Sequence, residues 1–262
     1  MRKNIYTSLM HGGTWIQAKE VVDMKTYTSF QELDALGEGL AKKYTGNTHR
    51  WNSSCFDIEG FITDFLKLQI LYEAFAEDDP SKIGFLSDGI TPLIVYRAGK
   101  KTPIVFPKDT IVIESFLQRS DESGRRRFTL AHEAAHFILN RHVPMQTACF
   151  HNEYDHEFHY SGEELAKMFS LNETLTNRLG AAVLMPPFLV GRALKKYNNG
   201  QPIVYYTEGV FAPDTKIRLQ SMSDALGVSY SALINRLREL RLLECRPIEE
   251  YIDHALFPKA SI

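Results

Sequence analysis

The segment Arg127–His136, with the sequence RFTLAHEAAH, constrains the fold of this chain more than any other segment. It places His132 and His136 four residues apart, so on a helix both imidazoles project from one face and can bind one ion. Glu133 lies about a quarter-turn away, where its carboxylate can touch a metal-bound water without being a ligand. The segment therefore predicts a helix that carries the H-E-x-x-H site of a zinc hydrolase.

The neighbours of this motif predict that the helix is buried. A solvent-exposed helix that carried the same residues by chance would have polar neighbours. The flanking positions are instead apolar or small: Phe128, Leu130, Ala131, Ala134, Ala135, Phe137, Ile138 and Leu139. This pattern favours a buried helix whose few polar side chains lie close together, as a metal centre requires.

The composition is that of an ordinary globular protein, with 262 residues of which 44% are hydrophobic and 24% charged. A net charge of -2 gives no overall bias towards nucleic acid or anionic membranes. Cys55, Cys149 and Cys245 are far apart and odd in number, which argues against a disulfide framework and favours a reducing cytoplasm. No apolar run approaches the roughly 20 residues of a membrane span, and residues 1–20 lack the apolar core of a signal peptide. We therefore expect a cytoplasmic protein that does not associate with membranes.

The hydrophobic pattern of the first half predicts an α+β fold. Ser29 and Glu32 are spaced as a capping box for a helix that ends near Tyr44, and Asp57 is expected to cap a second helix. Turn residues then separate short apolar stretches, which indicates a small, mostly antiparallel sheet packed with a zincin-like helical core. These stretches are Leu68–Phe75, Ile83–Leu86, Thr91–Arg97, Pro103–Phe106 and Thr110–Ser115. The motif helix is expected to run from just after Gly124 to about Asn140.

The second half is predicted to be mostly helical after a polar loop at 141–162. Helical patterns cover Glu163–Phe169, Asn172–Leu184, Phe188–Tyr197, Ile217–Leu226 and Tyr230–Leu243. Gly227 and Ser229 separate the last two patterns, so this pair resembles a helix-turn-helix. We divide the chain into an N-terminal extension at 1–27, a zincin-like metallopeptidase domain at 28–200 and a C-terminal helical segment at 201–262.

A catalytic zinc site usually has a third protein ligand and an open position for water, and two arrangements compete for that third ligand. The first uses His142, at the spacing of H-E-x-x-H-x-x-G-x-x-H, but Leu139 stands where a glycine would let the chain turn sharply. The second uses a glutamate from a later helix. The candidates are Glu153, Glu157, Glu163, Glu164 and Glu173.

Glu173 stands out among these glutamates because its helix also carries Gly180 and Ala181, flanked by Ala182, and such small residues let two helices approach closely. Asn177 lies one turn along on the same face and could support a ligand or a water. An acid in the first turn of a helix also complements the helix dipole without any metal, so the residues alone leave the third ligand open.

Two segments together resemble the ImmA/IrrE metallopeptidases. R-R-F-T-L-A-H-E-A-A-H at 126–136 and E-T-L-T-N-R-L-G-A-A-V-L-M-P at 173–186 are similar to that family's two motifs. The family patterns are R-F-T-x-A-H-E-x-G-H and E-x-x-A-[ND]-x-[FL]-[AG]-A-x-L-L-M-P. The resemblance extends over about 28–245. The departures at Ala135, Thr176 and Val183 do not remove a ligand.

The resemblance implies a role for each residue of the two motifs. His132, His136 and Glu173 would bind Zn²⁺, and Glu133 would be the general base. The activity implied is that of a zinc-dependent endopeptidase of regulatory type, whose protein substrate is a transcriptional repressor. A second donor for the oxyanion could come from the polar loop, where the candidates are Tyr154, His156, His159 and Tyr160.

The rival hypothesis is a DNA-binding or sensor regulator that uses the helix-turn-helix-like segment, with a non-catalytic zinc site. The phosphate contacts could then come from Arg236, Arg238 and Arg241. The nearby Glu239 and Glu244 reduce the net positive charge of this segment. We expect these helices to pack or to recognise protein, without direct nucleic-acid binding. The sequence does not indicate an oligomeric state.

Overall fold

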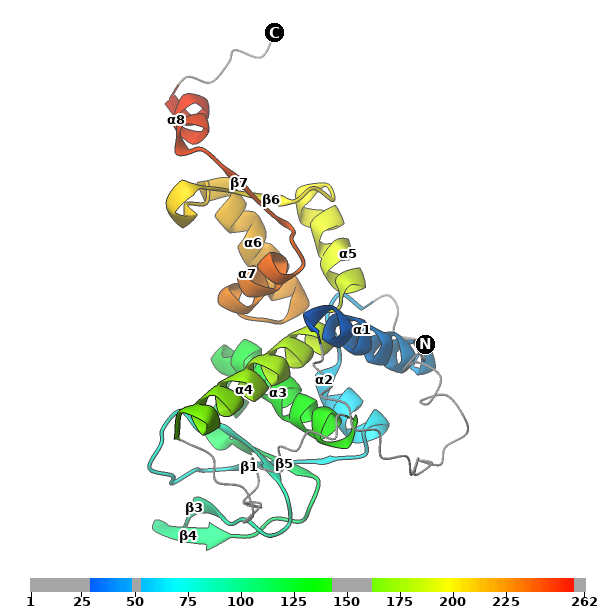
Figure 1. Cartoon of the computed structure of the whole chain (residues 1–262), viewed down its shortest axis with the longest axis vertical. Helices are drawn as coiled ribbons and strands as arrows, with labels where there is room; N and C mark the ends of the chain where they lie inside the picture. The colour runs from blue at the N-terminus through cyan, green and yellow to red at the C-terminus, as the bar shows by residue number, and fades with distance from the viewer. Residues whose placement is uncertain (1–28, 49–52, 143–161, 257–262) are drawn as a thin grey trace.

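The computed structural model describes residues 29–48, 53–142 and 162–256, and it has the α+β architecture expected from the sequence. Figure 1 shows an elongated arrangement in which the β3–β4 hairpin lies at one end and α8 at the other. The helices are α1 (Phe30–Asn47), α2 (Ile58–Gly60), α3 (Ser123–His142), α4 (Gly162–Leu184), α5 (Pro187–Asn198), α6 (Pro213–Leu226), α7 (Tyr230–Glu239) and α8 (Ile248–Leu256). The strands are β1 (Gln69–Glu73), β2 (Gly84–Ser87), β3 (Leu93–Arg97), β4 (Lys100–Ile104), β5 (Thr110–Glu114), β6 (Ile203–Tyr206) and β7 (Leu243–Arg246).

The first two helices begin where the sequence predicted. The Ser29 hydroxyl accepts from the backbone N–H of Glu32, whose carboxylate accepts in return from the backbone N–H of Ser29, which completes the capping box of α1. Asp57 caps α2 by accepting from the backbone N–H of Gly60, and a π-helical turn at Phe61–Phe65 follows directly. Both caps satisfy backbone donors that a helix start leaves without partners.

Each of the five predicted strands has a counterpart, although β4 covers Lys100–Ile104 and not Pro103–Phe106, and the strands make two sheets rather than one. β5 lies between β1, which pairs with it in parallel, and β2, which pairs with it antiparallel. β3 and β4 form a separate antiparallel hairpin. The hairpin packs across one face of the larger sheet, where Phe85 and Val112 meet Leu93 and Val95. The expected single sheet is therefore wrong: β3 is joined only by a bridge between Val95 and Phe75, just after β1, and the hairpin folds over one face of the larger sheet.

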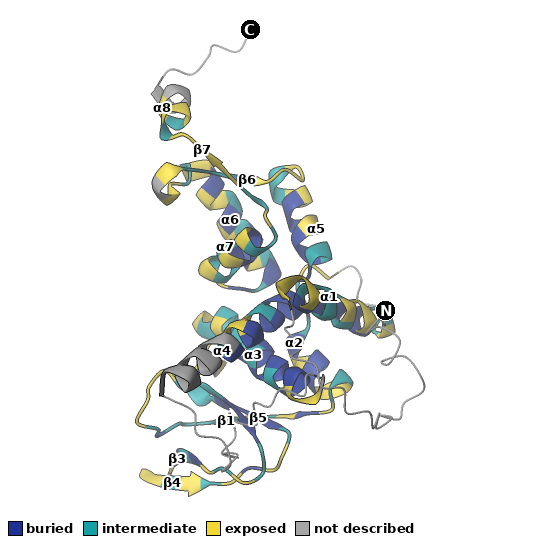
Figure 2. Cartoon of the chain, viewed as in Figure 1, coloured by how far each residue is buried: buried dark blue, intermediate teal, exposed yellow. Residues whose placement is uncertain are grey.

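The other face of the larger sheet packs against the helices. Successive side chains of a strand point to opposite faces, so Ile111 and Ile113 join the main core while Val112 faces the hairpin. This main core includes Leu130 and Ile138 of α3 and is the dark blue interior of Figure 2. The sheet thereby supports α3, the helix that carries the motif.

Close helix contacts at small residues were predicted for α4, and the structure confirms them. A Cβ added at Gly180 would lie 3.1 Å from the backbone oxygen of Ala131 in α3. On the other side of α4, a Cβ added at Gly37 of α1 would lie 2.6 Å from the Cβ of Ala182. α4 is therefore held tightly between α1 and α3.

The second half differs from the prediction at several places, and β6 and α8 correspond to no predicted element. α4 is one continuous helix rather than two, since no glycine or proline interrupts the chain between Gly162 and Gly180. α7 ends at Glu239, because Arg241 adopts a left-handed conformation with φ of 57° and the chain reverses there. Leu243 then opens β7, which pairs in parallel with β6. Within the described residues, no helix is both long enough and apolar enough to cross a bilayer.

Candidate metal centre

Three donor atoms from α3 and α4 converge on one point. The Nε2 atoms of His132 and His136 lie 3.0 Å apart. Glu173 places Oε2 at 3.3 Å from Nε2 of His132 and Oε1 at 3.5 Å from Nε2 of His136. Tetrahedral zinc with bonds of about 2.0–2.1 Å has ligand atoms about 3.3 Å apart, so this triangle fits a single ion. The group can hold a metal.

Two residues of α4 lie beside the Nδ1 atoms of His132 and His136 and so orient both imidazoles. Nδ1 of His132 lies 2.9 Å from the side-chain oxygen of Asn177, which can only accept, so Nδ1 carries a proton and Nε2 is the ring nitrogen that would bind a metal. The hydroxyl of Thr176 lies 3.4 Å from Nδ1 of His136. The sequence had suggested a supporting role for Asn177, and this contact provides one.

The charges of the donor group suit a cation. The hydrogen bond with His132 lowers the pKa of Glu173, although burial acts in the opposite direction. Burial pulls the pKa of His132 down, but the hydrogen bond with Glu173 and the negative charge of Glu133 outweigh it and raise that pKa. Glu173 is therefore ionised at neutral pH, as a carboxylate ligand must be.

Glu133 is buried beside the donor group and is not part of it. The backbone N–H of Leu86 in β2 donates to its carboxylate. Burial raises the pKa of Glu133 to about 7, and the nearby charge of His132 only partly opposes this effect. A carboxylate with a pKa near the working pH is well matched to accept and return a proton.

A cleft of about 260 Å³ opens beside Glu133 and His132. Its walls are the Ser81–Gly84 segment on one side and α3 residues Phe128 and Thr129 on the other. This volume approaches the roughly 300 Å³ at the lower end of ligand sites. The cleft can therefore admit part of a substrate next to the carboxylate.

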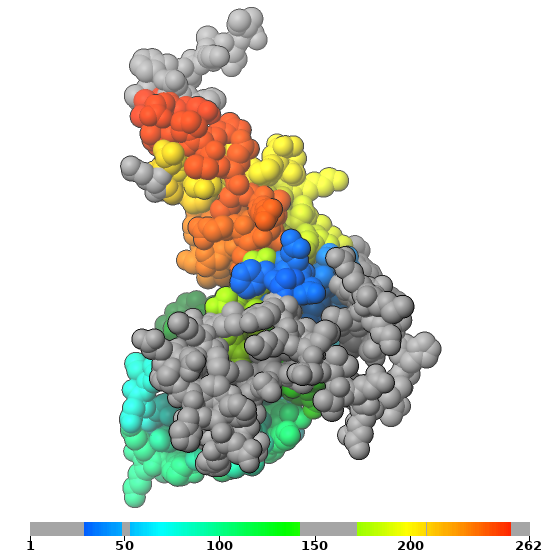
Figure 3. Space-filling model, in the orientation of Figure 1, coloured from blue at the N-terminus to red at the C-terminus, as the bar shows by residue number. Residues whose placement is uncertain are grey.

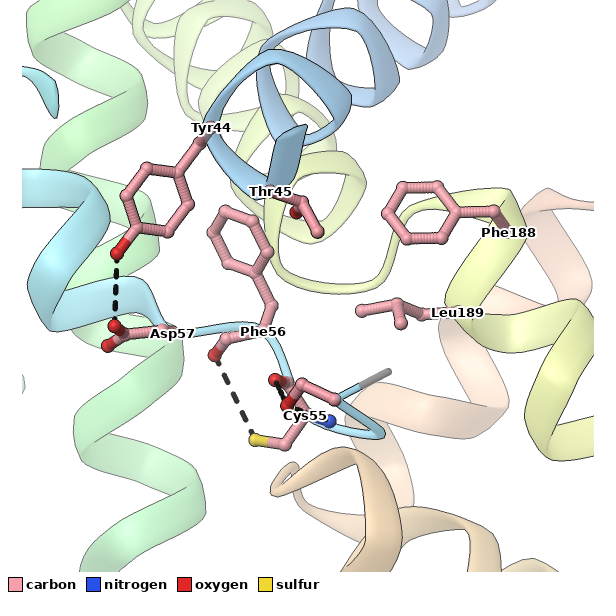
Figure 4. Close-up of a pocket in the computed structure, with 8 residues that line it drawn as sticks. Tyr44, Thr45, Cys55, Phe56, Asp57, Phe188 and Leu189 are labelled. Carbon is pink, nitrogen blue, oxygen red and sulfur yellow. Dashed lines mark hydrogen bonds between the residues drawn. The ribbon is translucent and has the colours of Figure 1, made fainter. Parts of the chain in front are cut away.

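A second cavity, of about 20 Å³, is lined by the end of α1, the Cys55–Asp57 segment and the start of α5 (Figure 4). On its wall the Tyr44 hydroxyl donates to Asp57 at 3.0 Å. Such a volume holds about one water molecule. It is too small to be a second substrate site.

The sequence did not identify the two β2 residues that position the Glu133 carboxylate, Gly84 and Leu86. A Cβ added at Gly84 would lie 2.5 Å from Oε1 of Glu133 and 2.7 Å from Cγ2 of Thr129, so a larger residue would displace the carboxylate. The available signal was a glycine inside a predicted strand, which often marks a close approach of other groups. The backbone donor of Leu86 left no signal, because every residue except proline has one.

Several other candidates lie where the structure does not describe side chains. They are His142, Glu153, Tyr154, His156, Glu157, His159, Tyr160, Glu163 and Glu164. Their predicted roles stay predictions.

The comparison with known families agrees with the motifs. Residues 114–238 match a peptidase family model described as the IrrE N-terminal-like domain, and this range contains both α3 and α4. Residues 114–238 are thus an ImmA/IrrE family metallopeptidase domain. Its substrates are accordingly proteins or peptides. Among curated proteins, none matches the chain.

Proposed function

We propose that this ImmA/IrrE family member is a cytoplasmic, zinc-dependent endopeptidase that cleaves a transcriptional repressor. The observation that carries the proposal is the donor triangle of His132, His136 and Glu173 with Glu133 buried at its side. A group that only stored or sensed zinc would not need a separate carboxylate with a raised pKa beside a cleft.

In this proposal His132, His136 and Glu173 hold the zinc. When bound, zinc lowers the pKa of a water molecule to near 7 and polarises the substrate carbonyl. Glu133 would accept a proton from the attacking water and would then pass that proton to the leaving amine. The C–N bond breaks as the amine is protonated, so the protons balance over one turnover.

The contacts that position the Glu133 carboxylate support its role as the base. The N–H of Leu86 fixes one side of the carboxylate, and the missing side chain at Gly84 leaves room for it. His132 and Glu133 are adjacent on α3, so the base and the metal position keep a fixed relation to each other. Preorganisation of this kind reduces the reorganisation needed during the reaction.

The DNA-binding alternative loses one of its three arginines in the structure. Arg236, one of the three arginines expected to contact phosphates, has a fully buried side chain. It is bonded to Asp34, to Glu239 and to the backbone of Met185, so it cannot reach a phosphate. The repressor as substrate rests on the family resemblance.

The test is to incubate the zinc-loaded protein with repressors encoded beside its gene and to follow cleavage by mass spectrometry. We expect a defined cut by the wild type and none by Glu133→Gln, which keeps the shape of the side chain but cannot accept the proton. The variant should keep its zinc. Cleavage by Glu133→Gln at the wild-type rate would contradict the assignment of the base. If neither protein cuts any of the repressors, the substrate assignment fails.

A further inference from the structure

The turn between α6 and α7 rests on α3, the helix that carries the two metal-site histidines. Nε of Arg127 donates to the backbone oxygen of Gly227 at 2.8 Å, and its Nη2 donates to the backbone oxygen of Phe56. Nearby, a Cβ added at Gly124 would lie 3.0 Å from the backbone N of Ser229. The start of α3 and the α6–α7 turn are therefore in direct contact.

The opposite end of α7 is tied to α4 and α1. Arg236 is fully buried, and its Nε donates to the backbone oxygen of Met185 at 3.0 Å, immediately after the end of α4. Its Nη1 donates to Oδ1 of Asp34 in α1 at 2.6 Å. Figure 1 shows α7 next to α1 and α4, and Figure 3 shows the C-terminal part of the chain seated on α1.

Arg178 of α4 closes these contacts into a network of two arginines and two acids. Its Nε donates to Asp34 at 3.1 Å, and its Nη1 lies 3.3 Å from Oε2 of Glu239. The same Glu239 oxygen accepts from Nη1 of Arg236 at 3.0 Å. Because the charges balance and are largely buried, loss of one member leaves the others uncompensated.

The arginine–acid network lies on a different face of α4 from the residues of the metal centre. Successive helix residues are about 100° apart, so Glu173, Thr176 and Asn177 lie within roughly one 100° sector. Arg178 points about 100° away from Asn177, towards α1 and α7. A rotation of α4 that broke the Arg178 contacts would also move Asn177 and Glu173 relative to the histidines of α3.

We propose that α6 and α7 act as a clamp, which holds α3 and α4 in the relative position that metal binding requires. Arg127 is the tie to α3 and Arg236 is the tie to α4, so both are positioning residues for the metal centre. The clamp explains why a fully buried arginine occurs in a helix pair that resembles a DNA-binding motif. The proposal rests on the metal centre of the proposed function and not on peptidase activity.

The test measures the zinc dissociation constant by competition with a chelator of known affinity, for proteins whose fold is checked by circular dichroism. We expect Arg236→Met and Arg127→Met each to bind zinc about tenfold more weakly, within the range of such indirect couplings. Arg238→Met is the matched control, because Arg238 is an exposed arginine of the same helix that donates to Asn235. It should stay within about twofold of the wild type. Two folded clamp variants that also stay within about twofold would overturn the proposal.

A measurement on the wild type covers the case in which a clamp variant does not fold. Coupling is reciprocal, so zinc binding should slow hydrogen exchange of backbone amides in α6 and α7. Unchanged exchange in both helices on zinc addition would contradict the clamp. If the wild type binds no zinc at all, the proposed function fails as well, whereas tight zinc binding with no response of α6 and α7 removes only the clamp.

Discussion

Replacement of Glu133 by glutamine should stabilise the zinc-free protein at neutral and alkaline pH. The wild-type carboxyl is buried, and burial raises its pKa from the ordinary value of 4.5 to about 7. The folded state therefore holds the proton more tightly than the unfolded state does. Glutamine has nearly the same shape but carries no charge, so it avoids the cost of ionisation.

The sign and size follow from the two pKa values of Glu133. Below pH 4.5 the carboxyl is protonated in both states, and its ionisation costs no stability. Between the unfolded and the folded pKa, the wild type loses stability as pH rises, and above about 7 the loss is complete. A tenfold change in proton affinity corresponds to about 1.4 kcal/mol, so the full loss is about 3 kcal/mol. Between pH 5 and pH 8 the wild type should lose about 2.5 kcal/mol relative to the variant.

The assay is urea unfolding of both proteins in the presence of a zinc chelator, at pH 5 and at pH 8. Glu249→Gln is the control, because Glu249 is an exposed glutamate of α8 and its carboxylate stays in contact with water. That control should show no comparable gain at pH 8. If the free-energy difference between Glu133→Gln and the wild type is the same at both pH values, the argument from burial is refuted.

Three further outcomes follow from the geometry. Asn177→Ala should weaken zinc binding by about 10- to 100-fold, because the proton on Nδ1 of His132 loses its acceptor, and chelator competition measures this. Gly84→Ala should cost about 1–3 kcal/mol in urea unfolding and lower turnover, since its Cβ would overlap Glu133. Gly39→Ala is its control: none of the described atoms lies within 4 Å of the added Cβ, so equal losses would contradict this reading. Duplex DNA at low salt should bind weakly, and tight salt-dependent binding that Arg238→Ala abolishes would restore the DNA-binding hypothesis.

The parts of the fold that depend on local rules could be predicted from the sequence. The capping box at Ser29, the cap at Asp57 and the glycine turn at Gly227 all act within a few residues, and each is present. The small residues of α4 also indicated a close contact with another helix, which Gly180 makes with α3. The i, i+4 spacing of the histidines fixed their common face in the same way.

The parts that depend on distant partners could not be predicted. The parallel pairing of β1 with β5 and the separate β3–β4 hairpin depend on contacts across the chain, which alternation within a strand does not encode. Only the rival hypothesis gave Arg236 a role, as a phosphate contact, yet Arg236 is buried and lies on the same helix face as Leu233 and Leu237. That spacing was the available signal, but its partner Asp34 lies in α1, which no local pattern connects to α7.

Metal analysis by mass spectrometry, on the purified wild type and a small set of variants, tests the metal centre most directly. We expect one zinc per chain in the wild type and in Glu133→Gln, and loss of zinc in His132→Ala and Glu173→Ala. His142→Ala should keep its zinc. If Glu173→Ala retains a full equivalent while folded His142→Ala loses it, the three-histidine arrangement is correct and the metal centre described above is wrong.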